Sequence, residues 1–424
     1  MDTPPQNDSQ KAGIAPEHLS GVPEKAPRIH IGFIDAIRAL AALYVMFGHA
    51  FAQLMPYKEA MAGINPRYEK ILTFIDVALF RHGHLAVAVF IVISGYCLML
   101  PLARHDKVAL DGTGGFIKRR AWRILPPYYA ALAFTLALML AVPGMSNVTK
   151  GEGASALPVF QTWTIVSHVL LFHHWSDLWI IKIVPPFWSI GVEWQIYFFM
   201  PLLLLPLLRR LGKMGMLLVS ALLCIVLTYA CASFLPEKQT FIHFIALFAA
   251  GMVTAQVCFS PSAESRRLRE RLPATQCFVA LLAFILMLLL LQTRASWSAK
   301  PLIAMIGRVT WANVWVMDYL VTLCFCSLLV GLCQETKSGT IGRIHRLLHW
   351  SPLVFVGHFS YSLYLIHDPI LRFICTVGEY LHFNAIMQYV VTFMVGVPCA
   401  IASGYLLFLS VERHFIRTLP SHAK

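Results

Sequence analysis

Residues 33–51 read FIDAIRALAALYVMFGHAF, an apolar run of the length that crosses a lipid bilayer as an α-helix. Further windows of about twenty mostly apolar residues follow it along the chain. Together they predict ten membrane spans, near residues 31–54, 84–103, 122–142, 187–207, 215–235, 240–258, 274–292, 312–333, 353–375 and 387–411. The predicted fold class is therefore all-α, a polytopic bundle of about ten transmembrane helices.

The composition of the whole chain supports this class. Of its 424 residues, 58% are hydrophobic and only 13% are charged, and the mean hydropathy is +0.66. A typical soluble domain carries about twice that share of charged residues. We therefore expect a multi-pass protein whose surroundings are the lipid bilayer.

The formal net charge of +13 is compatible with two interpretations, nucleic-acid binding and membrane topology. If the N-terminus is cytoplasmic, the predicted inner segments, together with Arg123 at the inner end of span 122–142, hold 22 of the 34 Lys and Arg residues. The predicted outer segments hold 10, and Arg38 and Arg372 lie within spans. Because basic residues accumulate on the cytoplasmic side of membrane proteins, we predict that both termini are cytoplasmic and that there is no nucleic-acid partner.

The chain is predicted to contain one membrane domain, residues 31–412. Residues 1–30 are polar and Pro-rich and contain no apolar signal sequence, so we expect a disordered cytoplasmic tail. Residues 413–424 are expected to form a second cytoplasmic tail.

The ten cysteines fall within or beside apolar segments, without metal-binding or disulfide spacing. They are therefore expected to serve as packing residues, with no metal site.

Two ionisable side chains interrupt the first predicted span. Arg38 and His49 are eleven residues apart, which places them within about 20° on one helix face and about 16 Å apart along the helix axis. Asp35 precedes Arg38 by one turn and is placed to pair with it. Ionisable groups at membrane depth usually face a protein interior or a water-filled cavity. The alternatives are that Arg38 extends to the inner interface and that a neighbouring helix satisfies a neutral His49.

Two further ionisable residues interrupt later spans. Glu193 lies a few residues into the predicted span 187–207, and His367 lies past the midpoint of the predicted span 353–375. Counted along their predicted spans, His49, Glu193 and His367 all lie in the outer half of the bilayer. We therefore expect them to converge at one site. A structural ion pair is the alternative for Glu193. Asp368 either belongs to the same cluster or faces the outer surface. The aromatic residues Trp188, Trp194 and Tyr197 are expected at the interface between membrane and water.

A pair of arginines opens the third predicted span. In residues 114–132, GGFIKRRAWRILPPYYAAL, Arg120 and Arg123 are three positions apart and share one helix face. They fit an ordinary cytoplasmic anchor, or a phosphate clamp, because guanidinium groups match phosphate oxygens.

From the residues alone, a transferase and a proton-coupled secondary transporter are both possible functions. The transporter would be expected to show paired repeats and broken helices, which the sequence does not display.

Five segments, taken in order, resemble the acyltransferase family 3 membrane proteins, which O-acylate bacterial glycans and other hydroxyl acceptors. The family's first-helix motif, an Arg and a His separated by ten residues, is similar to DAIRALAALYVMFGHA. Its second helix is similar to HGHLAVAVFIVISGYCLML, and its Arg-x-x-Arg motif to RRAWRILPPYY. Its Trp-Ser-x-x-x-Glu segment resembles FWSIGVEWQIYFFMPLL, and its Ser-Tyr-x-x-Tyr-x-x-His-x-Pro segment resembles SYSLYLIHDPI. These matches span residues 33 to 369.

The resemblance implies an O-acyltransferase of the bacterial inner membrane. Its donor would be a cytoplasmic acyl-CoA, most often acetyl-CoA, acting as a co-substrate with no bound cofactor. Arg120 and Arg123 would contact the CoA phosphates, and Arg38 would bind the donor or support the site electrostatically. His49 would be the general base on the acceptor hydroxyl, with an acyl-histidine intermediate as the alternative route.

The resemblance also implies an acceptor side. Glu193, His367 and Tyr364 would shape the catalytic site or bind the acceptor, which would be a glycan, a lipid-linked sugar or another molecule with a hydroxyl group. The acceptor would enter from the periplasmic side. Because the chain lacks the C-terminal hydrolase-like domain of some family members, we expect the membrane domain to complete the reaction. A homo-oligomer is compatible with these features.

Overall fold

The computed structural model describes residues 32–80, 82–107, 110, 112–145, 160–234, 241–295, 314–339 and 342–417. These residues form helices joined by turns, and no strand occurs among them. The predicted tail at residues 1–30 and residues 418–424 of the second predicted tail lie outside the described residues. The predicted all-α class is confirmed for the part of the chain that the structure describes.

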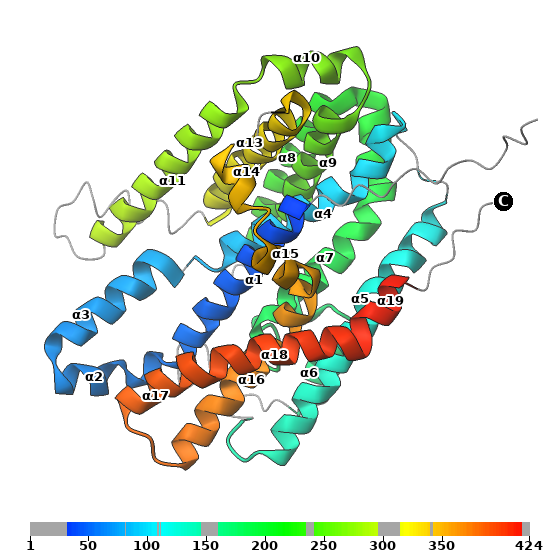
Figure 1. Cartoon of the computed structure of the whole chain (residues 1–424). Helices are drawn as coiled ribbons and strands as arrows, with labels where there is room; N and C mark the ends of the chain where they lie inside the picture. Colours follow the sequence, from blue (N-terminus) through cyan, green and yellow to red (C-terminus); the bar gives the residue numbers. More distant parts are fainter. Residues whose placement is uncertain are drawn as a thin grey trace, which may run out of the picture. The chain divides into compact units, whose positions relative to one another are not determined.

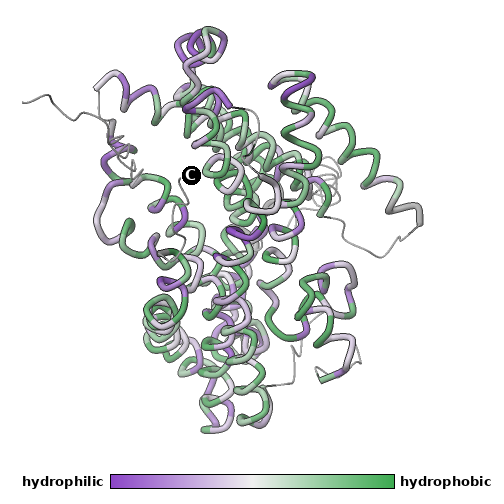
Figure 2. Tube along the Cα trace, turned by 90° about the vertical axis from the view of Figure 1, so that its right-hand side faces the viewer, coloured by the Kyte–Doolittle hydropathy of each residue, from purple (hydrophilic) through white to green (hydrophobic). Residues whose placement is uncertain are grey.

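The long helices are α1 (Gly32–Gln53), α4 (His84–Arg104), α5 (Thr113–Ala141), α8 (Leu205–Phe234), α9 (Phe244–Phe259), α11 (Ala274–Ala295), α13 (Val314–Ser338) and α16 (Ser360–Tyr380) (Figure 1). The shorter helices are α2 (Lys58–Ile64), α3 (Pro66–Ile75), α6 (Thr162–Val169), α7 (Trp188–Phe199), α10 (Ala263–Arg271), α14 (Arg343–Leu347), α15 (Ser351–His358), α17 (Ala385–Val391), α18 (Val397–Leu407) and α19 (Arg413–Arg417). Single helical turns of other pitch are η1 (Met55–Tyr57), η2 (Asp76–Phe80), η3 (His173–Trp175), η4 (Pro185–Phe187), η5 (Met200–Leu204), η6 (Thr392–Gly396) and η7 (Phe408–Glu412). The long helices are hydrophobic over most of their length (Figure 2).

Several of these helices have the length and apolarity of membrane spans. Among the described residues there are seven such stretches, or eight if the pair α9 and α10, bent by 95°, counts as one. Two predicted spans fall together in the stretch Pro185–Ala230, which is broken at Gly212, where φ is +70°. A multi-pass membrane protein is therefore supported, whereas ten spans and cytoplasmic termini remain predictions.

The ninth predicted span, 353–375, is divided in the structure. Helix α15 ends at His358 and α16 begins at Ser360, so the membrane-length helix starts later than the apolar window indicates. Asp368 and Arg372 lie within α16. Their charges lower its mean hydropathy, which explains why α16 is absent from the stretches selected by apolarity.

The segment between the first two predicted spans contains helices that the apolar windows do not predict. Asn65 separates α2 from α3, and its side-chain oxygen accepts a hydrogen bond (2.9 Å) from the backbone N–H of Arg67. Pro66 takes the first position of α3, where no intrahelical hydrogen bond is lost. Helix α2 contacts α17, and η2 contacts α1, so this segment flanks the His49 end of α1.

Helices α4 and α9 cross at two glycines. A Cβ atom on Gly95 of α4 would lie 2.1 Å from the carbonyl oxygen of Phe248, and one on Gly251 of α9 would lie 2.0 Å from that of Val92. Small residues at such crossings let two helix backbones approach closely in a membrane. This crossing holds α4, which carries one wall of the site described below.

We expect the Gly251→Ala variant to be less stable than the wild type. The added methyl group overlaps the carbonyl oxygen of Val92, so the two helices must separate, at a cost of about 1–3 kcal/mol. Thermal unfolding of the purified protein in detergent measures this loss. Gly63→Ala is the matched control, because no atom lies within 4 Å of its added methyl group. Equal unfolding temperatures for the two variants would contradict the role given to the crossing.

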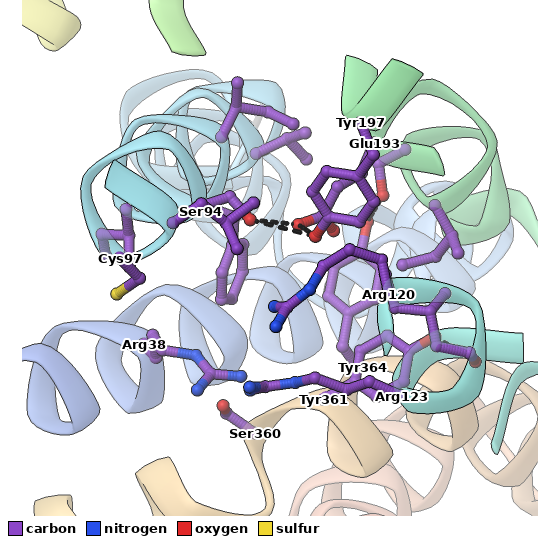
Figure 3. A pocket seen from close by; sticks show the side chains of 18 residues that line it. Arg38, Ser94, Cys97, Arg120, Arg123, Glu193, Tyr197, Ser360, Tyr361 and Tyr364 are labelled. Carbon is purple, nitrogen blue, oxygen red and sulfur yellow. Dashed lines mark hydrogen bonds between the residues drawn. The ribbon is translucent and has the colours of Figure 1, made fainter. Parts of the chain in front are cut away.

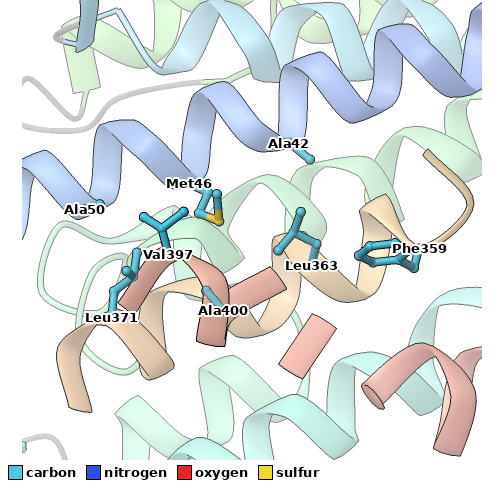
Figure 4. Close-up of a cluster of buried hydrophobic side chains, with 8 residues drawn as sticks. All are labelled: Ala42, Met46, Ala50, Phe359, Leu363, Leu371, Val397 and Ala400. Carbon is cyan, nitrogen blue, oxygen red and sulfur yellow. The ribbon is translucent and has the colours of Figure 1, made fainter. Parts of the chain in front are cut away.

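Helix α1 packs on α16 and α18 through a cluster of buried apolar residues (Figure 4). Its members are Ala42, Met46, Ala50, Phe359, Leu363, Leu371, Val397 and Ala400. The three residues from α1 are four positions apart, so they form one stripe along the helix. This stripe sets the rotation of α1 and thereby brings His49 beside α16.

Candidate active site

Five of the seven residues predicted for the site line one pocket: Arg38, Arg120, Arg123, Glu193 and Tyr364. They come from helices α1, α5, α7 and α16, and α4 completes the wall (Figure 3). The pocket has a cavity volume of about 110 Å³ and is partly open to solvent. The remaining two predicted residues, His49 and His367, do not line it.

Three arginines dominate the charge of the pocket. Arg120 and Arg123 extend from the first turns of α5, and Arg38 enters from α1 (Figure 3). Arg38 pairs with Asp35 one turn earlier, with 4.0 Å between Nη1 and Oδ1, as the sequence predicts. The Nε of Arg120 is buried without a hydrogen-bond partner among the described residues. Like charges that converge in this way favour an anionic ligand.

Glu193 is the one carboxylate among the residues that line the pocket. Its Oε1 accepts hydrogen bonds from the hydroxyl groups of Tyr197 (2.6 Å) and Ser94. Glu193 therefore faces hydroxyl groups, and no ion pair of this residue with an arginine is found within the described ranges. Tyr197 lies 3% exposed in the pocket wall, so its predicted place at the membrane interface is wrong. Its i+4 spacing from Glu193 is the sequence signal that indicates this contact.

A second carboxylate, Glu412 of η7, lies outside the pocket lining and only 2% exposed. Its Oε2 accepts hydrogen bonds from the hydroxyl (2.6 Å) and the backbone N–H (3.2 Å) of Ser362. Its charge interacts with Arg38 and Arg123. Glu412 therefore helps to hold two cationic side chains, a role that its position at the end of an apolar run does not indicate.

Tyr364 stands between the pocket and the two histidines. Its hydroxyl donates a hydrogen bond to the carbonyl oxygen of Pro186 (3.0 Å) and lies 2.7 Å from the hydroxyl of Ser189. The ring centroids of Tyr364 and His367 are 5.8 Å apart. The arginine pocket and the histidine pair are thus neighbours that share this tyrosine.

His49 and His367 form a pair, with ring centroids 5.3 Å apart. The Nδ1 of His367 lies 3.1 Å from the carbonyl oxygen of Leu363, which can only accept, so Nδ1 carries the proton. The Nε2 of neutral His367 is then an acceptor, and it is buried without a hydrogen-bond partner among the described residues. The side chain of His49 is 30% exposed, whereas His367 is buried.

Asp368 belongs to the histidine pair and does not face the outer surface. Its Oδ1 lies 3.6 Å from Nδ1 of His49 and accepts a hydrogen bond (3.2 Å) from Gln53. Its Oδ2 lies 3.0 Å from Nη2 of Arg372. The carboxylate is only 1% exposed. Of the two positions that the sequence leaves open for Asp368, the structure selects the cluster.

The predicted convergence of His49, Glu193 and His367 is correct for the two histidines and wrong for Glu193. Depth along a helix follows from counting residues, but the rotation of each helix does not. Helix α7 turns Glu193 toward Ser94 of α4, on the arginine side of Tyr364. The site therefore has two parts, an arginine pocket and a histidine pair.

A second buried charge cluster lies outside both parts. Asp318 of α13 is 1% exposed, and its Oδ2 lies 2.9 Å from Nε2 of His243, while its Oδ1 lies 3.8 Å from Nε2 of His84. These three residues connect α13, α9 and α4. Sequence patterns do not indicate this cluster, because the three residues are far apart along the chain and each stands near the end of an apolar run.

The long loop before α7 contains buried histidines. His168 and His173 stack with ring centroids 4.1 Å apart, and neither is exposed to solvent. Burial lowers the pKa of His168 and of His174 to about 4 and lowers the pKa of His173 further. The three rings are therefore neutral near pH 7 and add no positive charge to the site. In the described part of the chain, no group of three or more His, Cys, Asp and Glu side chains has the arrangement of a metal site.

Comparisons with known proteins place the sequence of this chain in a family. Residues 31–408 match the family model of the acyltransferase domain. The chain is 22% identical to the putative peptidoglycan O-acetyltransferase YrhL of Bacillus subtilis over 330 residues, which cover 73% of this chain and 48% of that protein. It is also 22% identical to the O-acetyltransferase OatA of Staphylococcus aureus over 322 residues, covering 72% and 48%.

A shorter match of 31% identity over 134 residues, covering 31% of this chain and 22% of the relative, links it to a putative O-acetyltransferase of Staphylococcus aureus. The chain spans about half the length of the first two relatives. No solved structure matches the chain. The match over residues 31–408 shows that this chain belongs to the acyltransferase 3 family, as its motifs predict.

Proposed function

We propose that this protein is a membrane O-acyltransferase that moves an acyl group, most often acetyl, from cytoplasmic acyl-CoA to a hydroxyl group of a glycan or lipid-linked sugar on the periplasmic side of the bacterial inner membrane. The observation that carries this proposal is the arrangement of the site. Three arginines suited to phosphate groups lie beside a pair of histidines suited to proton transfer, with Tyr364 between them.

The donor occupies the arginine pocket. Arg120 and Arg123 bind phosphate groups of CoA, because guanidinium forks and phosphate oxygens form strong charge-assisted hydrogen bonds. Arg38 contributes a third positive charge from α1. The pocket opens to solvent, and the pantetheine arm extends from it past Tyr364 to bring the thioester to His49.

The chemistry takes place at His49. Its unprotonated ring nitrogen accepts the proton of the acceptor hydroxyl while the hydroxyl oxygen attacks the thioester carbonyl carbon. The carbon–sulfur bond then breaks, the ester forms, and the CoA thiolate takes the proton from His49. No proton is gained or lost overall, and the acyl group passes directly from the sulfur of CoA to the hydroxyl oxygen without a covalent intermediate on the protein.

The acceptor approaches from the His367 side. Two relatives are named for acetyl transfer to peptidoglycan or for O-acetylation in general, which favours a sugar hydroxyl here. The Nε2 of His367 has no hydrogen-bond partner in the described part of the chain and is an acceptor that a sugar hydroxyl would satisfy. Family membership favours this function over the proton-coupled transporter, the alternative that the isolated residues leave open.

Label transfer tests the proposal. The purified full chain is incubated with acetyl-CoA labelled in its acetyl group and with peptidoglycan fragments or polysaccharides. We expect label in the glycan as an alkali-labile ester, at a rate that depends on the protein. A chain that binds acetyl-CoA but moves no label to any hydroxyl acceptor would overturn the proposed activity.

A further inference from the structure

The two oxygens of the Asp368 carboxylate have different partners on different helices. Oδ2 binds Arg372, which is on the same helix, α16. Oδ1 faces α1, where it meets two residues one turn apart, His49 and Gln53. Arg372 is held in turn by the carbonyl oxygen of Ile183, 3.3 Å from Nη1. Asp368 therefore forms a bridge between a fixed arginine and the imidazole of His49.

A pair of Asp368 and Arg372 alone would be an ordinary intrahelical ion pair, because the residues are four positions apart. Such a pair needs no partner on α1. The position of Oδ1 distinguishes a simple ion pair from a bridge to α1. Arg372 does not bind this oxygen, and His49 and Gln53 of α1 both turn toward it. The Nδ1 to Oδ1 separation of 3.6 Å is longer than a hydrogen bond and closes with a small movement of either side chain.

The charges around His49 come almost entirely from α16. The charged groups whose electrostatic effect reaches it are Asp368 and Arg372, and His367 is its titratable neighbour. The other elements at this stretch of α1 contribute aromatic rings. Phe80 of η2 lies against Gly48, and Phe393 of η6 stacks on Phe47. Asp368 is thus the one carboxylate positioned to act on His49 among the described residues.

We propose that Asp368 is the positioning residue for His49 in acyl transfer, held in place by Arg372 and Gln53. This inference rests on the proposed role of His49 as general base. A carboxylate at Nδ1 keeps the proton on that nitrogen and leaves Nε2 free to accept the proton of the acceptor hydroxyl. It also stabilises the imidazolium that forms during the attack. Arg372 prevents the carboxylate from turning away.

The test compares Asp368→Asn with the double variant Asp368→Asn/Arg372→Gln. We expect the single variant to lower kcat for acetyl transfer by about 10-fold or more, because loss of the carboxylate that orients a general-base histidine costs about 10⁴-fold in a Ser-His-Asp triad. Acetyl-CoA binding, measured by titration calorimetry, should stay unchanged, because Asp368 does not line the arginine pocket. Asp368→Glu keeps the charge and should retain more activity than Asp368→Asn.

The double variant separates positioning from charge neutralisation. If Asp368 serves only to neutralise buried Arg372, removing both charges leaves no uncompensated charge and should restore activity. If it positions His49, the double variant stays as impaired as the single one. The double variant also decides the question if Asp368→Asn alone fails to fold because Arg372 is left unpaired.

The pH profile gives a readout that a purely structural role does not move. Protonated His49 cannot act as a base, so kcat falls on the acid side. The carboxylate stabilises the protonated ring, and its removal should shift the acid limb of kcat to lower pH in Asp368→Asn. An unshifted limb with wild-type kcat, or recovery of activity in the double variant, would overturn the inference. Wild-type activity in His49→Ala would instead exclude His49 as the general base. A failure of the proposed function can therefore be distinguished from a failure of the inference about Asp368.

Discussion

Replacing His49 by alanine is expected to reduce acetyl transfer by about 1,000-fold or more while the protein stays inserted and folded. The imidazole is the group beside the pocket that can accept the hydroxyl proton, and general-base catalysis contributes about 10²- to 10⁴-fold. The side chain is 30% exposed and belongs to no apolar cluster, so its removal leaves the packing stripe of α1 intact. The rate at which label passes from acetyl-CoA to a glycan acceptor measures the loss of activity.

His105→Ala is the matched control for this variant. His105 is exposed at the end of α4 and lines no part of the pocket. It should transfer acetyl groups at the wild-type rate. Acetyl-CoA binding should survive in His49→Ala, because the arginine pocket does not include His49. A correctly folded His49→Ala protein with near wild-type turnover would exclude the general-base role.

The second large effect is expected at the donor end. The double variant Arg120→Ala/Arg123→Ala should bind acetyl-CoA about 100-fold more weakly, since each lost hydrogen bond to a charged group costs about 1.5–3 kcal/mol. Removing two of the three arginines leaves the pocket lining with Arg38 opposite Glu193. Calorimetric titration with acetyl-CoA at fixed ionic strength measures the change, because salt screens such contacts.

Lys118→Ala/Arg119→Ala provides the control for charge. These two residues precede Arg120 on the same helix, are exposed and do not line the pocket. Their removal lowers the net charge by the same amount as the Arg120 and Arg123 variant. If both double variants weaken donor binding equally, the effect comes from the general field of the inner face, and the phosphate clamp is wrong.

The two experiments together separate the parts of the site. His49→Ala should retain the donor and lose the transfer step, whereas the arginine variant should lose the donor first and transfer slowly at high acetyl-CoA concentration. This division corresponds to the structure, in which Tyr364 separates the arginine pocket from the histidine pair. A single mixed site would give the same pattern of losses in both variants.

The sequence alone determined the class of the protein and indicated five residues that line the arginine pocket. Long apolar windows require helices in a bilayer, because every backbone polar group must be satisfied within the segment. Residue spacing within a helix also predicted local contacts correctly, as in the pair Asp35 and Arg38. The motifs of the family point to Arg120 and Arg123, which line the pocket, and to His49, whose role as general base stays a prediction.

The apolar windows were less informative about the segment between the first two spans and about where α16 begins. Helices α2 and α3 are short and carry charged residues, so their stability comes from a cap and from contacts with other helices. The break at Phe359 lies inside an apolar run, which a hydropathy window does not resolve.

Only the tertiary structure decided which polar residues meet. It separated Glu193 from His49, moved Tyr197 from the interface into the pocket wall, and joined Asp368 to His49. The physical reason is that periodicity gives the face of a helix but not the direction in which that face points. The rotation of α1 is set by the stripe of Ala42, Met46 and Ala50 that packs on α16 and α18, and that of α4 by its crossing with α9 at Gly95. Contacts between helices, which are distant in the chain, therefore build the site.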